Sequence, residues 1–341
     1  MTPDRFKAIT SQYGQTKIAV IGDYCLDRYL EIDPAKEEIS IETNLPVHNV
    51  VRVRSQPGGA GTILNNLVAL GLGAIFPVGF SGDDGEGYEL RKALRQKKGV
   101  QSLYLLKTDL RRTFTYCKPL RMEPGKPPVE HSRLDSKNWT PTPDVVQGEL
   151  IASSARAARE ADGLILLDQV DVPETGVITA RLLEALGCIV QELPELLVLA
   201  DSRRGLRGWP SVSFKMNAAE LQSLAGTKAD ANLDEIRETA TALAARQMKP
   251  VFITMAERGI LAAAADGRSA HAPALPVRGP IDIVGAGDAV TANLAAALAC
   301  GATLQESLEL AMAAASVVIH QLGTTGTATV AQIGEVLEMA P

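Results

Sequence analysis

The sequence predicts an α/β protein built on an open, mostly parallel β-sheet with helices on both faces. Short runs rich in β-branched and other apolar residues alternate along the chain with longer segments of helical apolar spacing. The apolar fraction of 46% and the charged fraction of 22% are typical of a globular protein. A chain of 341 residues can bury a large core, and we expect a single domain over residues 1–341.

The expected elements follow one another in strand–helix order. Lys17–Gly22 (KIAVIG) is a continuous apolar run, typical of a strand buried on both faces. The other expected strands are Ala74–Gly79, Gly163–Asp168, Glu195–Asp201 and Pro250–Thr254. The expected helices are Gly61–Leu70, Gly85–Lys97, Val145–Ala161, Ala231–Gln247, Ala286–Cys300 and Leu304–Ile319. Since ligands bind outside the carboxyl ends of such strands, the strand-end Asp168 and Asp201 lie on the expected ligand side.

Two segments depart from this order. Residues 30–54 and 103–134 alternate apolar and polar residues and contain several prolines. This pattern disfavours helices and indicates strands outside the main sheet, able to pair into a small second layer or lid. Long surface loops are the alternative.

Charge and composition argue against several function classes. A net charge of −6 without a basic block disfavours binding to nucleic acid or to an anionic membrane. The most apolar stretches are far shorter than the ~20 residues of a membrane span, and the polar N-terminus lacks a signal-peptide pattern. The 4 cysteines have no metal-binding spacing and are typical of reduced thiols. We therefore expect a cytoplasmic protein.

The segment Asp282–Asp288 (DIVGAGD) directly precedes an apolar helix. Backbone N–H groups in the first turn of a helix lack internal partners, and together with the helix dipole they form an anion site. The small residues Gly285, Ala286 and Gly287 let a phosphate approach this site closely. Asp288 falls in the first turn, where it can accept the proton of an attacking hydroxyl. The pattern predicts a phosphoryl-transfer site with Asp288 as the base.

Two other interpretations fit this segment. The helix dipole favours an Asp in the first turn and glycines make tight turns, so the motif can be purely structural. A dinucleotide-binding glycine pattern (GAGDAV) is the second alternative. That unit requires a following strand with an acidic end, whereas the sequence after Asp288 predicts two helices and a short tail.

The same segment resembles the C-terminal signature, D-T-x-G-A-G-D, of the PfkB/ribokinase family of carbohydrate kinases. The resemblance continues in order from about residue 17 to about residue 337. IGDYCLDRYL is similar to the family's opening strand, and GGAGTILNNLVALG, which begins at Gly58, is similar to its Gly-Gly signature. Asn217 and Glu220 match an N-x-x-E motif. Thr254–Gly259 resembles T-x-G-x-x-G, and Gly323 begins a matching Gly-Thr pair.

The resemblance implies a ribokinase-like three-layer α/β/α sandwich with a small β lid, and ATP-dependent phosphoryl transfer to a sugar hydroxyl. It implies that the base is Asp288 and that the anion hole consists of Gly285, Ala286 and Gly287. The implied sugar-binding residues are Asp27, Gly58, Gly59, Asn66 and Asp282. The implied nucleotide-binding residues are Asn217, Thr254, Gly259, Gly287 and Gly323. Mg²⁺ would be organised, mostly through water, by Asn217 and Glu220.

Several implied roles have structural alternatives. Asn217 also fits a helix N-cap, with Glu220 completing a capping box, and both roles can coexist. A turn or cap is the alternative for Asp27, Gly58 and Gly59. The loop after the strand-end Asp201 is basic and can either bind a phosphate or be solvated; its residues are Arg203, Arg204 and Arg207.

One branch of the family fits best. Ile39–Val47 (ISIETNLPV) resembles a segment of heptose-7-phosphate kinases, in which the lid often forms a dimer interface. The expected partners are therefore ATP, a sugar or sugar phosphate, and a second copy of the chain bound through the lid. Kinases of this branch are often fused to a nucleotidyltransferase, and we expect the kinase part alone here.

The sequence departs from the branch pattern at several positions. Thr62 stands where an Asn is usual, and Ala256 replaces the first Gly of T-x-G-x-x-G. Val284 stands where Thr is frequent, Met312 where Asn is usual, and Leu167–Val170 lacks the usual D-Y-x-K-G. These differences keep open an alternative function, a catalytically weak relative that binds a sugar or nucleotide as a regulator. An unrelated α/β binding or redox protein is a third hypothesis.

Overall fold

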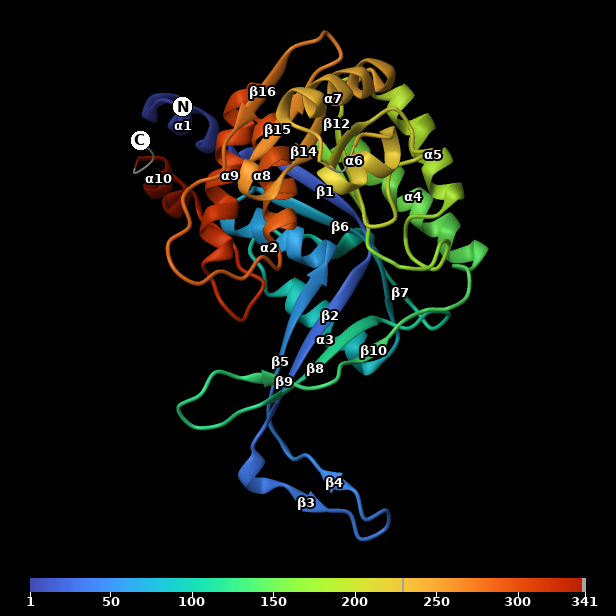
Figure 1. Ribbon diagram of the computed structural model, residues 1–341. Coiled ribbons are helices and arrows are strands. Elements are labelled where there is room, and N and C mark those ends of the chain that lie inside the picture. Colours follow the sequence, from blue (N-terminus) through green and yellow to red (C-terminus); the bar gives the residue numbers. More distant parts are fainter. Residues whose placement is uncertain (229, 339–341) are drawn as a thin grey trace.

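A nine-stranded sheet runs through the middle of the computed structural model, which describes residues 1–228 and 230–338 (Figure 1). The predicted span of 1–341 includes residues 229 and 339–341, which lie outside the described part. The strand order is β16-β15-β14-β13-β12-β11-β1-β6-β7, parallel from β14 to β7 and antiparallel at the other edge. The strands are β1 (Lys17–Gly22), β6 (Ala74–Gly82), β7 (Leu105–Thr108), β11 (Gly163–Asp168), β12 (Leu197–Ser202), β13 (Ser213–Asn217), β14 (Val251–Thr254), β15 (Ile260–Ala263) and β16 (Ser269–Ala272).

Helices cover both faces of this sheet (Figure 1), which confirms the predicted three-layer α/β/α sandwich. One face carries α2 (Ala60–Leu70), α8 (Ala286–Ala299) and α9 (Leu304–Ile319), with α1 (Pro3–Thr10) and α10 (Val330–Glu338) beside them. The other face carries α4 (Asp144–Glu160), α5 (Ala180–Glu192), α6 (Ala218–Ala225) and α7 (Leu233–Gln247). A further helix, α3 (Gly85–Arg95), lies against β2, β5 and β6.

The continuous apolar runs of the central strands follow from burial on both faces. Successive residues of a strand point to opposite sides, so Ile18 and Val20 of β1 join the core under α2, α8 and α9. Ala19 and Ile21 join the second core, under α4 and α5. Both sides of β1 must therefore be apolar, which is the pattern that predicts this strand from sequence.

A small second sheet leaves the main sheet at the carboxyl end of β1 (Figure 1). It has the order β10-β8-β2-β5, with β9 paired to β8, and a β3–β4 hairpin projects beyond it. Only Asp23 separates β1 from β2, and β5 runs directly into α2. The strands are β2 (Tyr24–Ile32), β3 (Glu38–Ile39), β4 (Pro46–Val47), β5 (Val50–Gly59), β8 (Phe114–Arg121), β9 (Val129–Glu130) and β10 (Leu134–Ser136).

The boundaries of the two segments expected to lie outside the main sheet differ from the sequence-based ones. Within 103–134, Leu105–Thr108 is the edge strand β7 of the main sheet, and the small sheet begins only at Phe114. For the other segment, expected at 30–54, strand pairing begins before its expected start, at Tyr24 in β2. That the small sheet closes over a ligand as a lid stays a prediction.

The sequence patterns did not predict helix α10 or strand β13. The chain beyond α9 was expected to be a tail, but it forms α10, whose Ile333 and Val336 are buried in the core. Strand β13 was missed because Lys215 interrupts its apolar run, and this lysine is nevertheless buried. Among the described residues, no helix is both long and apolar enough to cross a membrane.

Candidate active site

The loop before α8 is shaped by Asp282 and Gly285. The N–H of Asp282 donates to the carbonyl of Ile319 at 2.7 Å, and its Oδ1 accepts from the N–H of Val284 at 3.0 Å. Gly285 follows with a φ of 83°, in the left-handed region that favours glycine. A Cβ at Gly285 would lie 2.8 Å from Cγ2 of Thr325, so glycine is also required for space. This turn places Asp288 in the first turn of α8.

The start of α8 offers fewer free N–H groups than expected. The N–H of Ala286 donates to the carbonyl of Ile283 at 3.2 Å, so it closes the turn. The N–H groups of Gly287 and Asp288 come next, where a helix has no internal acceptors. A Cβ at Gly287 would lie 3.4 Å from Nζ of Lys215, so this cation lies against the first turn of α8. The start of α8 can therefore bind an anion through its N–H dipoles, with the ammonium group of Lys215 close by.

A buried ion pair supports this end of the site. Nζ of Lys215 on β13 lies 2.7 Å from Oδ2 of Asp201 on β12, with the two side chains 8% and 13% exposed. Oγ1 of Thr291 on α8 donates to the same carboxylate oxygen at 3.1 Å. Asp201 was expected on the ligand side of the sheet, but Lys215 and Thr291 were missed. The available signal was a lysine inside a strand, two residues before Asn217.

The same charges determine the pKa of Asp288. Burial raises the pKa of this carboxyl, the negative charge of Asp201 raises it further and the positive charge of Lys215 opposes the rise, with a result of about 7. Burial lowers the pKa of Lys215, but the charge of Asp201 and the hydrogen bond to it outweigh burial and leave that pKa raised. Lys215 is thus charged at neutral pH, while Asp288 has the pKa suited to a general base.

Asp27 and the Gly-Gly pair lie together across β2 and β5. Asp27 is buried, and a Cβ at Gly58 would lie 2.5 Å from its Oδ2, so glycine leaves this carboxylate room. Gly59 has a φ of 58°, and a Cβ there would lie 2.4 Å from the carbonyl oxygen of Asp23. Burial raises the pKa of Asp27, while the charge of Lys118, whose Nζ lies 3.8 Å from Oδ1, opposes the rise. These glycines have steric reasons beyond a simple turn.

Asn66 is not brought into this group. It is fully buried in α2, and its Nδ2 donates to the carbonyl of Thr62 at 3.0 Å. A direct contact between Asn66 and the sugar stays a prediction. The burial of Asn66 and its bond within α2 do not favour it. Thr62 lies close to the loop before α8, because its Cγ2 would be 3.7 Å from a Cβ at Gly285.

Two of the expected nucleotide residues, Asn217 and Thr254, lie at the carboxyl ends of β13 and β14. Asn217 is the register partner of Thr254, so the two residues are neighbours on adjacent strands. Gly259 has a φ of 85°, and a Cβ there would lie 2.0 Å from the carbonyl oxygen of Ala272. Ala256, which replaces a Gly of the motif, has a φ of 51°, so an alanine holds a backbone conformation suited to glycine. Gly323 also has a positive φ, of 70°, and faces open space.

Asn217 and Glu220 form a capping box at the start of α6. Oδ1 of Asn217 accepts from the N–H of Glu220 at 2.9 Å, and Oε2 of Glu220 accepts from the N–H of Asn217 at 2.7 Å. Burial raises the pKa of Glu220, and the charge of Asp201 raises it further, so a cation nearby would be favourable. The described residues include no cluster of three or more His, Cys, Asp or Glu that could hold a metal directly. Since Mg²⁺ usually keeps several waters and needs only one or two protein carboxylates, the carboxylate of Glu220 is compatible with the predicted metal role, which stays a prediction.

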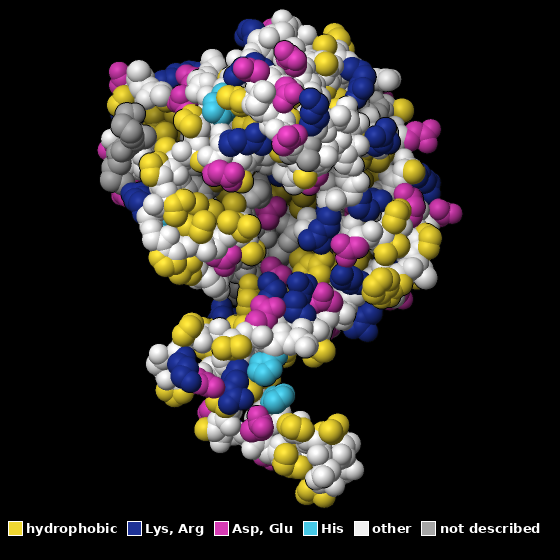
Figure 2. Space-filling model, viewed as in Figure 1, with side chains coloured by type: hydrophobic (Ala, Val, Ile, Leu, Met, Phe, Trp, Pro, Cys, Tyr) yellow, Lys and Arg dark blue, Asp and Glu magenta, His cyan; other side chains and the backbone are white. Residues whose placement is uncertain are grey.

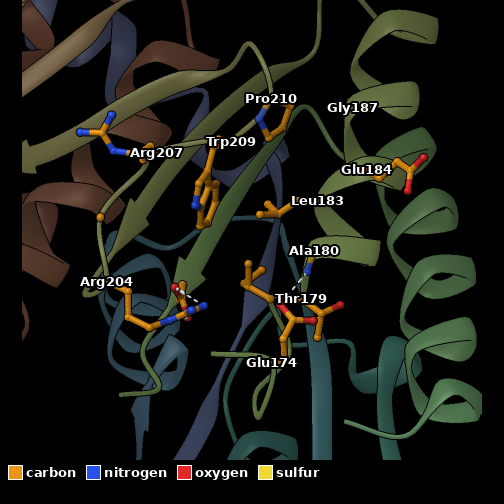
Figure 3. A pocket seen from close by; sticks show the side chains of 14 residues that line it. Glu174, Thr179, Ala180, Leu183, Glu184, Gly187, Arg204, Arg207, Trp209 and Pro210 are labelled. Atoms are coloured by element: carbon orange, nitrogen blue, oxygen red, sulfur yellow. Dashed lines mark hydrogen bonds and ion pairs between the residues drawn. The ribbon is translucent and has the colours of Figure 1, made fainter. Parts of the chain in front are cut away.

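A separate cavity of about 530 Å³ lies between the end of β11, the start of α5 and the loop after β12 (Figure 3). Trp209 and Leu183 face each other across it, and Arg204 lies at its lower end (Figure 3). Nη2 of Arg204 is 2.8 Å from Oδ2 of the buried Asp168, so this arginine belongs to an ion pair. Arg207 points away and donates to carbonyls at the end of α6. The lining includes Asp168, Arg204 and Arg207, which the sequence placed on the ligand side or in the basic loop, but none of the residues predicted to bind the sugar, the nucleotide or Mg²⁺.

Known proteins resemble this chain over most of its length. The family model described as pfkB family carbohydrate kinase matches residues 15–330. A bifunctional protein HldE of Hyphomonas neptunium is 31% identical over 327 residues, which cover 96% of this chain and 64% of that protein. Another, of Gluconacetobacter diazotrophicus, is 32% identical over 330 residues, which cover 94% and 63%. The chain thus spans less than two thirds of the length of these curated relatives.

Solved structures share the fold at lower identity. The ribokinase of Arabidopsis thaliana, solved with ribose and ATP, has a TM-score of 0.68 at 18% identity, with 95% of this chain and 99% of that chain covered. Phosphofructokinase-2 of Escherichia coli, solved with substrates and products, has a TM-score of 0.70 at 16% identity, with 95% and 98% covered. The family match over most of the length and the ribokinase-like fold lead to one conclusion: the chain belongs to the pfkB family of carbohydrate kinases.

Proposed function

We propose that the chain transfers a phosphoryl group from ATP to a hydroxyl of a sugar phosphate of the heptose 7-phosphate class. The observation that carries the kinase chemistry is the juxtaposition of Asp288, the start of α8 and the buried cation Lys215. The resemblance of Ile39–Val47 to heptose-7-phosphate kinases and the similarity to HldE proteins support the choice of acceptor.

Each group of the site has a role in this reaction. Asn217 and Glu220 would hold Mg²⁺, which would neutralise charge on the phosphates of ATP, the phosphoryl donor. The carboxylate of Asp288 takes the proton from the acceptor hydroxyl. Lys215 and the N–H groups of the first turn of α8 stabilise the negative charge that spreads over the transferring group. Asp27 accepts hydrogen bonds from sugar hydroxyls and thereby orients the acceptor, next to Gly58.

An acceptor panel with ATP consumption as the readout tests this function. Heptoses, hexoses and pentoses are offered both free and phosphorylated, and turnover is expected with a phosphorylated sugar. The second candidate is a weak relative that binds without turnover, which the departures at Thr62 and Ala256 favour. Nucleotide binding without turnover on any acceptor would support that candidate. A cytoplasmic location, where ATP is abundant, stays a prediction.

The activity is expected to rise with pH through a midpoint near 7. Asp288 acts as a base only when ionised, and its pKa in the free protein is raised to about 7 by burial and by Asp201. Since kcat/KM reports groups of the free enzyme, its logarithm should rise with a slope of about one below the midpoint and level off above it. A profile measured from pH 5 to 9 checks this. A flat profile over that range would contradict the assigned role of Asp288.

We further propose that the β3–β4 hairpin and neighbouring strands pair with a second copy of the chain. Figure 2 shows hydrophobic side chains at the tip of this projecting arm. Ile39 and Leu45 are 57% and 63% exposed there, and Ile41 is 97% exposed. Apolar side chains that project so far into solvent are typical of an interaction surface.

Replacing Ile41 with Asp is expected to convert a dimer into a monomer at micromolar concentration. A charge in the middle of an apolar interface must be desolvated without a partner, which is strongly unfavourable. Sedimentation velocity measures the change. Leu103→Asp is the matched control, because Leu103 is also highly exposed, at 76%, but lies outside the arm. A wild-type monomer, or a dimer unaffected by Ile41→Asp, would contradict the proposed interface.

A further inference from the structure

A group of cations surrounds Tyr116 on strand β8. Cζ of Arg133 lies 4.9 Å and Nζ of Lys137 lies 5.8 Å from the centre of the Tyr116 ring. Figure 2 shows Lys and Arg side chains, with Asp and Glu beside them, where the small sheet meets the body of the molecule. Clustered positive charge of this kind favours the binding of an anion.

Lys137 shares one carboxylate with a third cation, Arg203. Nζ of Lys137 lies 2.7 Å from Oδ2 of Asp171, and Nη1 of Arg203 lies 3.3 Å from Oδ1 of the same residue. Arg133 has its own partner, Asp135, at 2.8 Å. The Lys137–Asp171–Arg203 group therefore has one positive charge more than its carboxylate balances. Arg203 and Asp171 are about half exposed, at 51% and 48%, and Lys137 is 26% exposed.

This group borders the acceptor end of the candidate active site. Tyr116 is the register partner of Asp27 on the adjacent strand β2, so the two side chains are neighbours on one face of the small sheet. The positive charge of Arg203 acts to lower the pKa of both Asp288 and Tyr116. An acceptor held between Asp27 and Asp288 would thus have Arg203 and Lys137 at its side.

We propose that Arg203 and Lys137 bind the phosphate of the acceptor and that the carboxylate of Asp171 competes with it for these two cations. The inference rests on the proposed sugar-phosphate kinase function and adds the residues that recognise the anionic group. In the absence of acceptor, Asp171 occupies the position of that anion. Binding a phosphate requires the carboxylate to move aside, so Asp171 weakens the affinity for phosphorylated sugars.

The backbone of the loop that carries Asp171 is fixed at both ends, whereas the carboxylate of Asp171 is half exposed. Both ends are fixed, because the buried carboxylate of Asp23 accepts from the N–H of Gln169 at 2.8 Å and from the N–H of Val177 at 2.6 Å. Nη2 of Arg111 also donates to the carbonyl of Thr175 at 2.8 Å. The half-exposed carboxylate of Asp171 is held by the two cations themselves, and exposed ion pairs are weak enough to exchange.

The substitution Asp171→Asn tests the competition through its sign. Removing the competing charge should lower KM for a phosphorylated sugar about three- to tenfold, as expected for the loss of exposed ion pairs, and leave KM for ATP unchanged. If Asp171 instead holds the two cations in place for the substrate, KM should rise. A rise in KM would overturn the proposal. Arg203→Gln and Lys137→Gln are expected to raise it, and no change in either would also overturn the proposal.

Binding of inorganic phosphate separates this inference from the proposed reaction. Calorimetric titration of the protein with inorganic phosphate needs no turnover, so it gives a result even if the acceptor is another sugar. Asp171→Asn should tighten phosphate binding and Arg203→Gln should abolish it. Asp266→Asn is the matched control, because Asp266 forms a similar exposed pair with Arg268, at 2.7 Å, away from this group. Equal phosphate affinity in all of these proteins would overturn the inference.

Discussion

Replacing Asp288 with Asn is expected to lower kcat by about 10²–10⁴-fold, the usual contribution of a positioned general base. Asn has nearly the same shape but cannot take the proton of the acceptor hydroxyl. The N–H groups of the first turn of α8 and Lys215 remain, so the affinity for ATP should be nearly unchanged. Steady-state kinetics and nucleotide titration measure the two quantities. Activity within tenfold of the wild type would show that Asp288 is not the base.

The stability of the same variant distinguishes lost chemistry from misfolding. The pKa of Asp288 is raised to about 7 in the folded protein from an ordinary value of 3.8, so the folded state binds the proton more tightly than the unfolded chain. The stability that the folded state gains by binding this proton is fully present below the ordinary pKa of 3.8 and is lost as the pH rises through about 7. A neutral asparagine side chain at this position does not ionise and would not carry this penalty. The variant should therefore gain stability relative to the wild type as the pH rises through this window, as urea unfolding would show.

The sequence predicts the parts of the site that are local in the chain. The turn at Asp282, the positive φ of Gly285 and the first-turn position of Asp288 all lie within seven consecutive residues, so one motif specifies them. The capping box of Asn217 and Glu220 is equally local, with a spacing of three. Short-range geometry of this kind follows from backbone chemistry, and a pattern search can find it.

Residues that meet only through the sheet could not be placed in this way. Asp201, Lys215 and Thr291 come from β12, β13 and α8, and only the strand order brings the three together. Lys215 is also the reason that strand β13 was not predicted, because a lysine in an apolar run argues against a buried strand. Leu105–Thr108 was assigned to the lid for a related reason, since edge strands carry a weak apolar pattern.

The structure also explains why the first Gly of the T-x-G-x-x-G motif, which is Ala256 in this chain, is a glycine in the family pattern. The position of Ala256 has a φ of 51°, where a residue with a Cβ is strained. From sequence alone, the expected effect of this alanine was one extra methyl near the nucleotide. The backbone shows that the glycine of the motif answers a conformational need, which no single sequence reveals.

Replacing Lys215 with Met is expected to destabilise the fold by about 3–5 kcal/mol and to lower kcat by more than about 10²-fold. The substitution leaves the carboxylate of Asp201 buried beside Asp288, with only the hydroxyl of Thr291 as a partner. Loss of the cation should also raise the pKa of Asp288 further, which removes the active form of the base at neutral pH. Urea unfolding and the pH profile of kcat/KM measure these effects.

The double variant Lys215→Met with Asp201→Asn separates support of the fold from catalysis. Removing both charges relieves the unpaired carboxylate, so most of the lost stability should return, as is usual when a buried ion pair is replaced as a whole. Turnover should not return, because the positive charge beside Gly287 is still absent and the N–H groups of the first turn of α8 carry only partial charges. Recovery of turnover together with stability would mean that Lys215 serves only to hold Asp201. A stable but inactive double variant would instead place Lys215 among the groups that act on the phosphoryl group itself.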